Sequence, residues 1–374
     1  MRIGLAIEGG GMRGAVGAGM VAALHELGLC DAFDIVYGSS AGALVGAYFV
    51  SKQIPRYGCS VYYECLGNAD SFIRPLRLVR SVGLGALQVR QWLRDRRGLG
   101  PPVLDLSYLL VDVMQQERPL DWDLFWRRNA VQPLRVMASG IVTQEPRVLG
   151  SHNGGFDSVQ TLERCLRASM LIPGISGPPV EIPAAPEPLA DALLTEAIPM
   201  RAALAEGCTH VVVLRTKADG VRVTKRLSLG EALIARRYFG RKFKYPAMLK
   251  HMLASSHKRR YAEDILYLNK GSRGHRVSVP CPYEYCSAPG KAAEGYLLPV
   301  ALPAGSEEMG RLETRPLPIL QAIQRGFVAA YDLFAPVSEA VDRGPPPLGA
   351  PSGLSPGEAE VRRVFPDALV EPAI

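Results

Sequence analysis

The chain has 374 residues, of which 48% are hydrophobic and 21% are charged, and its net charge is +7. These values are typical of a packed globular protein with one large domain or two smaller ones. A membrane-spanning chain is excluded, since no run approaches the roughly 20 apolar residues that cross a bilayer. Seven cysteines without close pairing favour free thiols. With no signal peptide before the polar turn at residues 8–11, we expect a cytoplasmic protein without a metal site.

The first fifty residues predict alternating strands and helices. Residues 2–7 form a short apolar run typical of a buried strand, and a glycine-rich loop over residues 9–14 follows. A helix is expected over 15–27, a second strand over 33–37, and a second helix after Gly38-Ser39-Ser40-Ala41-Gly42. This order indicates an α/β fold with a parallel sheet and helices packed on it.

The remaining elements extend the same domain. Further strands are expected at 135–142, 210–214, 275–279 and 296–301, with extended structure at 180–182. Helices are expected at 103–116, 158–169, 199–206, within 225–260 and at 317–334. We therefore expect one domain over 1–335, with core motifs in 1–215, a basic helical extension at 220–270 and C-terminal elements at 271–335. Residues 336–374 are rich in proline and predict a flexible tail.

Ser40 lies at the apex of the predicted strand–turn–helix elbow. The pattern Gly38-x-Ser40-x-Gly42 places the serine hydroxyl beyond the end of the sheet, where it can act as a nucleophile, with Ala41 opening the helix. A side chain at Gly38 or Gly42 would crowd the turn. Because this short pattern also occurs in ordinary loops, its meaning depends on the neighbouring segments.

The glycine loop after the first strand fits two kinds of site. Its spacing, Gly9-x-Gly11-x-x-Gly14, is that of dinucleotide-binding loops, but the same amides can also hold an oxyanion. Because adjacent parallel strands bring this loop and Ser40 to one edge of the sheet, we favour an oxyanion loop. Arg13 adds a cation suited to a phosphate head group or to fixing the loop. The candidate loop residues are Gly9, Gly10, Gly11, Arg13 and Gly14.

A serine nucleophile needs a base, and the best candidate is a carboxylate. Asp191 lies between apolar residues, and a carboxylate held against a serine in a dry site gains basicity through desolvation. The alternative is that Asp191 caps a helix over 193–197, which composition alone favours. None of the histidines has the sequence context of a catalytic residue; they are His25, His152, His210, His251, His257 and His275.

Three ordered motifs resemble the patatin-like phospholipase family, in particular its bacterial-type single-domain esterases. They are the glycine loop in residues 8–14, the elbow in residues 38–42, and Arg167-Ala168-Ser169-Met170-Leu171-Ile172-Pro173-Gly174. The similarity continues through 178–180, Asp191 and 197–200. Order and spacing agree over about residues 1–215, and more loosely to about residue 335.

The resemblance implies a three-layer α/β/α fold with a mostly parallel sheet, and hydrolysis of lipid esters without a cofactor. Ser40 matches the family nucleophile, Asp191 its partner, and the glycine loop the oxyanion hole, to which the Ala41 amide adds a further donor. The chain departs from the family pattern Asp-Gly-Gly or Asp-Gly-Ala, because Ala192 and Leu193 follow Asp191. Alanine there fits a negative φ, whereas a positive φ costs about 1 kcal/mol. A degenerate relative that binds lipid without hydrolysing it is therefore the first alternative.

The positive charge is concentrated in residues 225–260, which hold eleven Lys or Arg and one acid, Glu231. Two interpretations are open. The segment draws the protein to an anionic membrane, with its apolar helical faces at the interface, or it forms a solvated basic face. The expected partners are a lipid or phospholipid substrate and an anionic membrane. Nucleic acid is not expected, since aromatic interleaving is sparse and no recognition motif is present.

Overall fold

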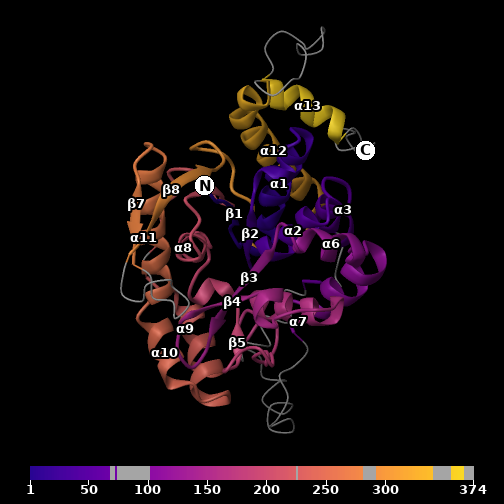
Figure 1. The fold of residues 1–374 in the computed structure, drawn as a ribbon. Helices are drawn as coiled ribbons and strands as arrows, with labels where there is room; N and C mark the ends of the chain where they lie inside the picture. The colour runs from indigo at the N-terminus through magenta and orange to yellow at the C-terminus, as the bar shows by residue number, and fades with distance from the viewer. Residues whose placement is uncertain (68–71, 74–101, 225, 281–291, 340–354, 366–374) are drawn as a thin grey trace.

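The computed structural model describes residues 1–67, 72–73, 102–224, 226–280, 292–339 and 355–365 (Figure 1). At its centre lies a mixed sheet with the strand order β4-β3-β2-β1-β6-β8-β7, in which β5 also pairs with β3. The strands are β1 (Ile3–Ile7), β2 (Ile35–Ser39), β3 (Leu134–Gly140), β4 (Pro146–Leu149), β5 (Leu189–Ala190), β6 (His210–Leu214), β7 (Val277–Val279) and β8 (Ala293–Val300).

The sheet is mostly parallel, as predicted. The pairs β1–β2, β1–β6, β2–β3 and β6–β8 are parallel, whereas β4, β5 and β7 pair antiparallel with their neighbours. Ile7 at the end of β1 is in register with both Gly38 and Leu214. The glycine loop, the serine elbow and the turn after β6 therefore leave the sheet at the same edge.

Helices surround the sheet. The α-helices are α1 (Gly14–Glu26), α2 (Ala41–Val50), α3 (Arg56–Ser60), α6 (Trp122–Asn129), α7 (Val159–Met170), α8 (Met200–Ala205), α9 (Leu229–Ala235), α10 (Pro246–Leu253), α11 (Ser256–Gly271), α12 (Pro316–Glu339) and α13 (Pro356–Val364). The π-helices are η3 (Val61–Cys65), η4 (Tyr108–Glu117) and η7 (Arg236–Lys242), and the 3-10 turns include η1 (Gly11–Arg13) and η6 (Ala192–Leu194). No helix within these described ranges is long and apolar enough to cross a bilayer.

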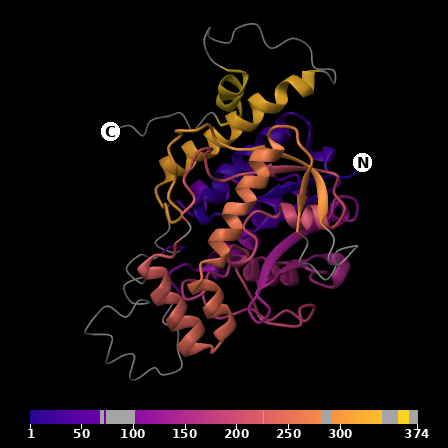
Figure 2. The same cartoon turned by 90° about the vertical axis from the view of Figure 1, so that its left-hand side faces the viewer.

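Alternating side chains of the strands pack on two helical layers, which gives the expected α/β/α architecture. Leu5 and Ile7 join the core formed with α1, α2 and α12, whereas Ala6 between them joins the core formed with α8 and α11. Figure 1 shows these helices on opposite sides of the sheet. Figure 2 shows α9 and α10 side by side and projecting away from it.

The segment over 103–116 begins as irregular chain and not as the predicted helix. The amides of Val103 and Leu104 donate to the carbonyl oxygen of Ile175, at 2.9 and 3.3 Å. Because those donors are used by a distant loop, helical structure begins only just before η4. The short strand β4, which pairs with β3, had no counterpart in the sequence-based prediction.

The C-terminal segment also differs from the flexible tail predicted over 336–374. The helix α12 continues to Glu339, and α13 forms over nine residues of the expected tail. Ser355 and Glu358 form a capping box that starts α13, and Phe365 is buried with its ring 6.0 Å from that of Phe327 on α12. Capping and apolar packing thus order this part of the tail, while 340–354 and 366–374 lie outside the described residues.

Candidate active site

Ser40 occupies a sharp elbow between β2 and α2. Its backbone has φ 52° and ψ −123°, a conformation that costs a non-glycine residue about 1–3 kcal/mol. A Cβ at Gly38 would lie 2.4 Å from Ala43 Cα, and one at Gly42 would lie 2.3 Å from the Ile7 carbonyl oxygen. Only glycine fits these two positions, so the elbow packs directly against the end of β1.

The hydroxyl of Ser40 donates a hydrogen bond to Asp191 Oδ2 at 2.9 Å. Asp191 follows β5 and is 2% exposed, while Ser40 is 8% exposed. The other carboxylate oxygen, Oδ1, accepts from the amide of Leu193 at 2.7 Å. Both sequence interpretations of Asp191 therefore fit the structure, because one oxygen caps η6 and the other contacts the serine.

Burial raises the pKa of Asp191 to about 6, although the hydrogen bonds from Leu193 and Ser40 and the charge of Arg311 act in the opposite direction. Such a carboxylate is ionised at neutral pH. It is also a stronger base than a solvated aspartate, so it is suited to accept a proton from the adjacent hydroxyl.

The side chains after Asp191 do not displace its carboxylate from Ser40. Within the described chain, the non-glycine residues with positive φ are Ser40, Lys52, Gln144, Lys244 and Ser255, so Ala192 avoids the left-handed region. Ala192 is fully buried, and Leu193 contributes its amide to the carboxylate. The conformational cost considered for alanine at this position therefore does not arise.

The glycine loop lies against the serine elbow. A Cβ at Gly9 would lie 2.9 Å from Ser40 Cβ, which shows how closely the two segments approach. The Gly9 amide donates to Ala197, and the Met12 amide to the Arg311 carbonyl oxygen at 3.1 Å. The amides of Gly10 and Gly11, at the start of η1, have no acceptor in the described part of the chain. They can therefore donate to a developing negative charge.

Arg13 is engaged in holding the chain around this loop. Its Nε donates to the Met309 carbonyl oxygen at 2.8 Å, and its Nη2 lies 3.6 Å from Glu308 Oε2. Of the two uses expected for Arg13, these contacts favour fixing the loop. They fasten the segment between β8 and α12, whose Arg311 carbonyl oxygen accepts from Met12.

Several residues that support this geometry were not predicted as site residues. Ser169 at the end of α7 accepts from the Ser40 amide at 2.8 Å, and Ser139 in β3 donates to the Asp191 carbonyl oxygen at 2.7 Å. Glu8 accepts from the Thr216 amide and from Tyr261, both at 2.7 Å. Ser169 and Glu8 belong to the motifs quoted above, which could have identified them, whereas Ser139 carries no sequence signal.

The histidines take no part in this arrangement. No histidine in the described ranges hydrogen-bonds Ser40 or Asp191. His251 contacts the Leu194 carbonyl oxygen at 2.9 Å, and burial, chiefly, lowers the pKa of His257 to about 4. The described residues also contain no group of three or more His, Cys, Asp or Glu side chains that could hold a metal ion.

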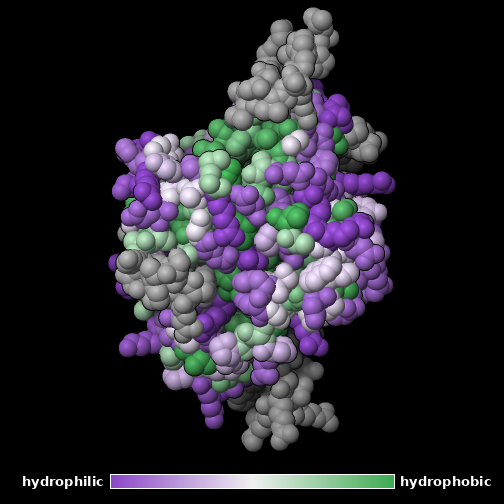
Figure 3. Space-filling view, in the orientation of Figure 1, coloured by the Kyte–Doolittle hydropathy of each residue, from purple (hydrophilic) through white to green (hydrophobic). Residues whose placement is uncertain are grey.

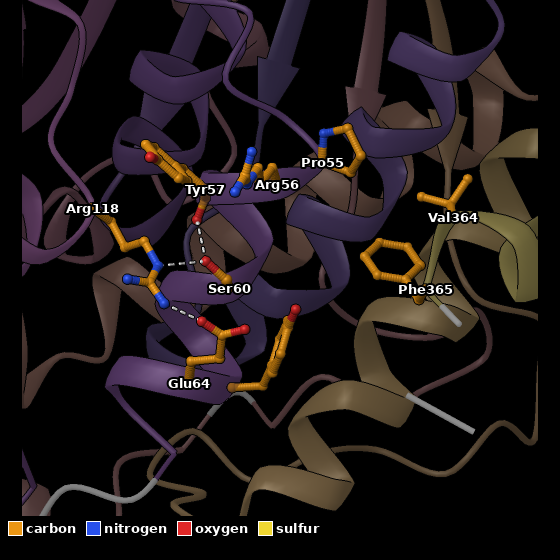
Figure 4. A pocket seen from close by; sticks show the side chains of 9 residues that line it. Pro55, Arg56, Tyr57, Ser60, Glu64, Arg118, Val364 and Phe365 are labelled. Carbon is orange, nitrogen blue, oxygen red and sulfur yellow. Dashed lines mark hydrogen bonds and ion pairs between the residues drawn. The ribbon is translucent and has the colours of Figure 1, made fainter. Parts of the chain in front are cut away.

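Two cavities lie away from Ser40. Figure 4 shows one of about 480 Å³ between α3, η3 and the end of α13, where Arg118 hydrogen-bonds Ser60 at 3.0 Å and pairs with Glu64. Another, of about 620 Å³, lies where β1 and β3 begin, and there Arg135 pairs with Glu206 at 3.1 Å. Arginines outnumber carboxylates in the lining of both cavities, and neither lining includes Ser40 or Asp191.

The comparisons with known proteins agree with the motifs. A sequence profile described as patatin-like phospholipase matches residues 5–204, more than half of the chain. The crystal structure of VipD from Legionella pneumophila is 13% identical, with a TM-score of 0.41 over 91% of this chain and 67% of VipD. That likeness is too distant to carry a functional argument. No curated protein matches the chain.

Proposed function

Because the chain belongs to the patatin-like phospholipase family, we propose that it is a serine hydrolase that cleaves carboxylic esters of lipids through Ser40 and Asp191. Membership associates the chain with lipid hydrolysis in general. The observation that carries the finer assignment is the 2.9 Å hydrogen bond from Ser40 to a buried carboxylate. Beside that pair lie the amides of Gly10 and Gly11, which have no acceptor among the described residues and could stabilise the oxyanion of acyl transfer.

In the proposed reaction, Asp191 takes the hydroxyl proton as Ser40 Oγ bonds to the ester carbonyl carbon. The carbonyl electron pair moves to its oxygen, which the amides of Gly10 and Gly11 stabilise, with Ala41 as a further donor. Collapse of this intermediate expels the alcohol, which receives the proton from Asp191, and leaves an acyl group on Ser40. Asp191 then deprotonates a water molecule that attacks the acyl carbon. The bond from that carbon to Ser40 Oγ breaks, Oγ takes the proton back from Asp191, and the fatty acid is released.

The basic segment supports contact with an anionic membrane next to this site. Leu229 and Leu233 on α9 are 87% and 52% exposed, among exposed cations such as Arg236 and Lys244. In Figure 3, hydrophobic and hydrophilic residues lie side by side at the lower left, where Figure 1 places α9 and α10. Tyr238 donates to the Gly177 carbonyl oxygen at 2.7 Å, and His251 on α10 contacts Leu194 in η6. A membrane on these helices would therefore lie beside the turn that follows Asp191.

Vesicle binding tests this contact. Replacing Leu229 and Leu233 by Glu should weaken co-sedimentation with phosphatidylglycerol vesicles by about tenfold, because apolar area at the interface is lost and charge opposes the lipid. Leu266→Glu is the matched control, since Leu266 is 68% exposed on α11. If the variant with Glu at Leu229 and Leu233 binds the vesicles as well as Leu266→Glu does, the basic segment is a solvated face and not a membrane contact.

The proposed cytoplasmic location is supported by cysteine chemistry. In the described chain the cysteines are free and buried, as a reducing compartment allows; they are Cys30, Cys59, Cys65, Cys165 and Cys208.

Labelling of Ser40 by a fluorophosphonate tests the enzyme assignment directly. The wild-type protein should be labelled stoichiometrically, Ser40→Ala should not be labelled, and Ser51→Ala, which removes another buried serine hydroxyl, should react normally. Absence of labelling would favour the degenerate lipid-binding alternative. Thermal stabilisation by NAD or FAD, together with an unreactive Ser40, would favour the dinucleotide-binding alternative.

A further inference from the structure

We propose that the cavity where β1 and β3 begin binds a small organic anion, a carboxylate carried on a short aliphatic body. Arg2 precedes β1 and Arg135 is the second residue of β3, whereas Ser40 follows the end of β2, and these strands are parallel. The cavity therefore lies at the edge of the sheet opposite to Ser40. It is separate from the site proposed for ester hydrolysis, so the two proposals can fail independently.

Arg135 is a buried cation with an unused hydrogen-bond donor. It lines the cavity and is 7% exposed. Its Nε donates to Glu206 Oε2 at 3.1 Å, while its Nη1 is buried and has no hydrogen-bond partner among the residues that the structure describes. Native proteins rarely leave a buried donor without an acceptor, since this costs free energy, most of all in a charged group. An acceptor that enters the cavity would remove that cost.

His152 lies beside the same unused donor. A Cβ built on Gly150 would lie 2.6 Å from His152 Nδ1 and 3.1 Å from Arg135 Nη1, so the two nitrogens converge on the space that this glycine leaves open. Both side chains line the cavity. Burial lowers the pKa of His152, and the charge of Arg135 lowers it further. The ring is therefore neutral at pH 7, and its tautomer with a proton on Nδ1 can donate to the acceptor that Arg135 binds.

The lining carries one positive charge that no carboxylate balances. Its arginines are Arg2, Arg135 and Arg147. Arg147 pairs with Glu187 at 2.6 Å, and Arg135 pairs with Glu206 at 3.1 Å. Arg2 Nη1 donates at 2.5 Å to the backbone carbonyl oxygen of Glu206, and Arg2 has no carboxylate partner within the described ranges. Because Arg2 and Arg135 both contact Glu206, the unbalanced charge lies next to the unused donor.

The walls of the cavity favour a carboxylate with an aliphatic body. A guanidinium pairs well with a carboxylate or a phosphate, but a phosphate monoester carries a charge of about −1.5 to −2 at pH 7, more than the single unbalanced cation. The volume of about 620 Å³ is typical of sites for small ligands. Aliphatic residues that can cover a short hydrocarbon chain line much of the remaining wall; they are Val148, Leu149, Ala184, Ala185, Pro186 and Ala205.

Calorimetric titration with hexanoate tests this site. The wild-type protein should bind one equivalent. Arg135→Lys should weaken binding by about 10-fold or more, because lysine can keep the ion pair with Glu206 but lacks the planar fork that presents Nη1. Arg2→Ala removes the unbalanced charge and should weaken binding by a similar factor. Arg56→Ala is the matched control, because Arg56 lines the other cavity, and it should leave the affinity unchanged.

Failure of the wild type to bind hexanoate, or equal affinity in the wild type and the Arg135 and Arg2 variants, would overturn the proposal. Thermal unfolding reports whether Arg135→Lys is folded. Arg2 is half-buried and His152 is exposed, so Arg2→Ala and His152→Ala decide the matter if it is not. Binding of hexanol as tight as that of hexanoate would show an apolar cavity and refute the anion site. Tighter binding of hexyl phosphate, lost in the same variants, would assign the cavity to phosphate esters and overturn the carboxylate assignment.

Discussion

Replacing Asp191 by Asn separates the chemistry of this carboxylate from its structural role. The amide of Leu193 needs an acceptor, which the asparagine carbonyl oxygen can supply in place of Asp191 Oδ1. The side-chain NH₂ group then faces Ser40 Oγ and donates a hydrogen bond to it, whereas the wild-type carboxylate accepts a hydrogen bond from Ser40. The variant should keep the fold of η6 and lose the base.

The expected loss of activity is large, whereas the expected stability change is a gain. Without a base, kcat/KM should fall by about 10³- to 10⁴-fold, or about 4 to 5.5 kcal/mol. The pKa of Asp191 is raised from 3.8 to about 6 on folding, so the wild-type protein loses stability as pH rises from about 4 through about 6. Asparagine carries no charge to desolvate and avoids this loss, which is at most about 3 kcal/mol above about pH 7.

The assay combines kinetics on a p-nitrophenyl ester with thermal unfolding at about pH 4 and about pH 8. At each pH the melting temperature of wild type is subtracted from that of Asp191→Asn. This difference should be larger at about pH 8 than at about pH 4. Asp112→Asn is the control, because Asp112 is exposed on η4 and should alter neither quantity. Full activity in Asp191→Asn would refute the role of the base. A stability difference that does not change with pH would refute the buried, proton-binding carboxylate.

Three further results are expected. Wild-type kcat/KM should rise about tenfold per pH unit below about pH 6 and level off above it, as Asp191 ionises; a flat profile would contradict its role. Gly42→Ala should lower the free energy of unfolding in urea by about 1–3 kcal/mol, since its Cβ meets the Ile7 carbonyl oxygen at 2.3 Å. Gly230→Ala on α9 has open space and should stabilise by up to about 1 kcal/mol, so a similar loss in both variants would refute the packing argument. Glu196 is buried, its Oε2 has no hydrogen-bond partner in the described part of the chain, and burial raises its pKa to about 8. Stability is therefore lost as pH rises from about 4.5 through about 8, so Glu196→Gln should raise the melting temperature at about pH 9 by several degrees and little at about pH 5. Equal shifts at the two pH values would show that the carboxyl does not titrate there.

Local sequence determined the parallel strands and the serine elbow. Short apolar runs such as residues 2–7 and 210–214 have the length and composition of buried strands, and β1 and β6 formed there. The glycine at position 38 has a local cause too, because a Cβ there would lie 2.4 Å from Ala43 Cα in the same elbow. Such features can be predicted since they depend on neighbours along the chain.

Tertiary structure decided what surrounds Ser40. Asp191 is 151 positions away, and only its burial and the amide of Leu193 show that one carboxylate both caps a turn and meets the serine. Ser139 and Arg311 reach the site from other strands and loops, so no local pattern marks them. The effect of the Arg311 charge on Asp191 depends on the packing of distant segments, which periodicity and spacing do not encode.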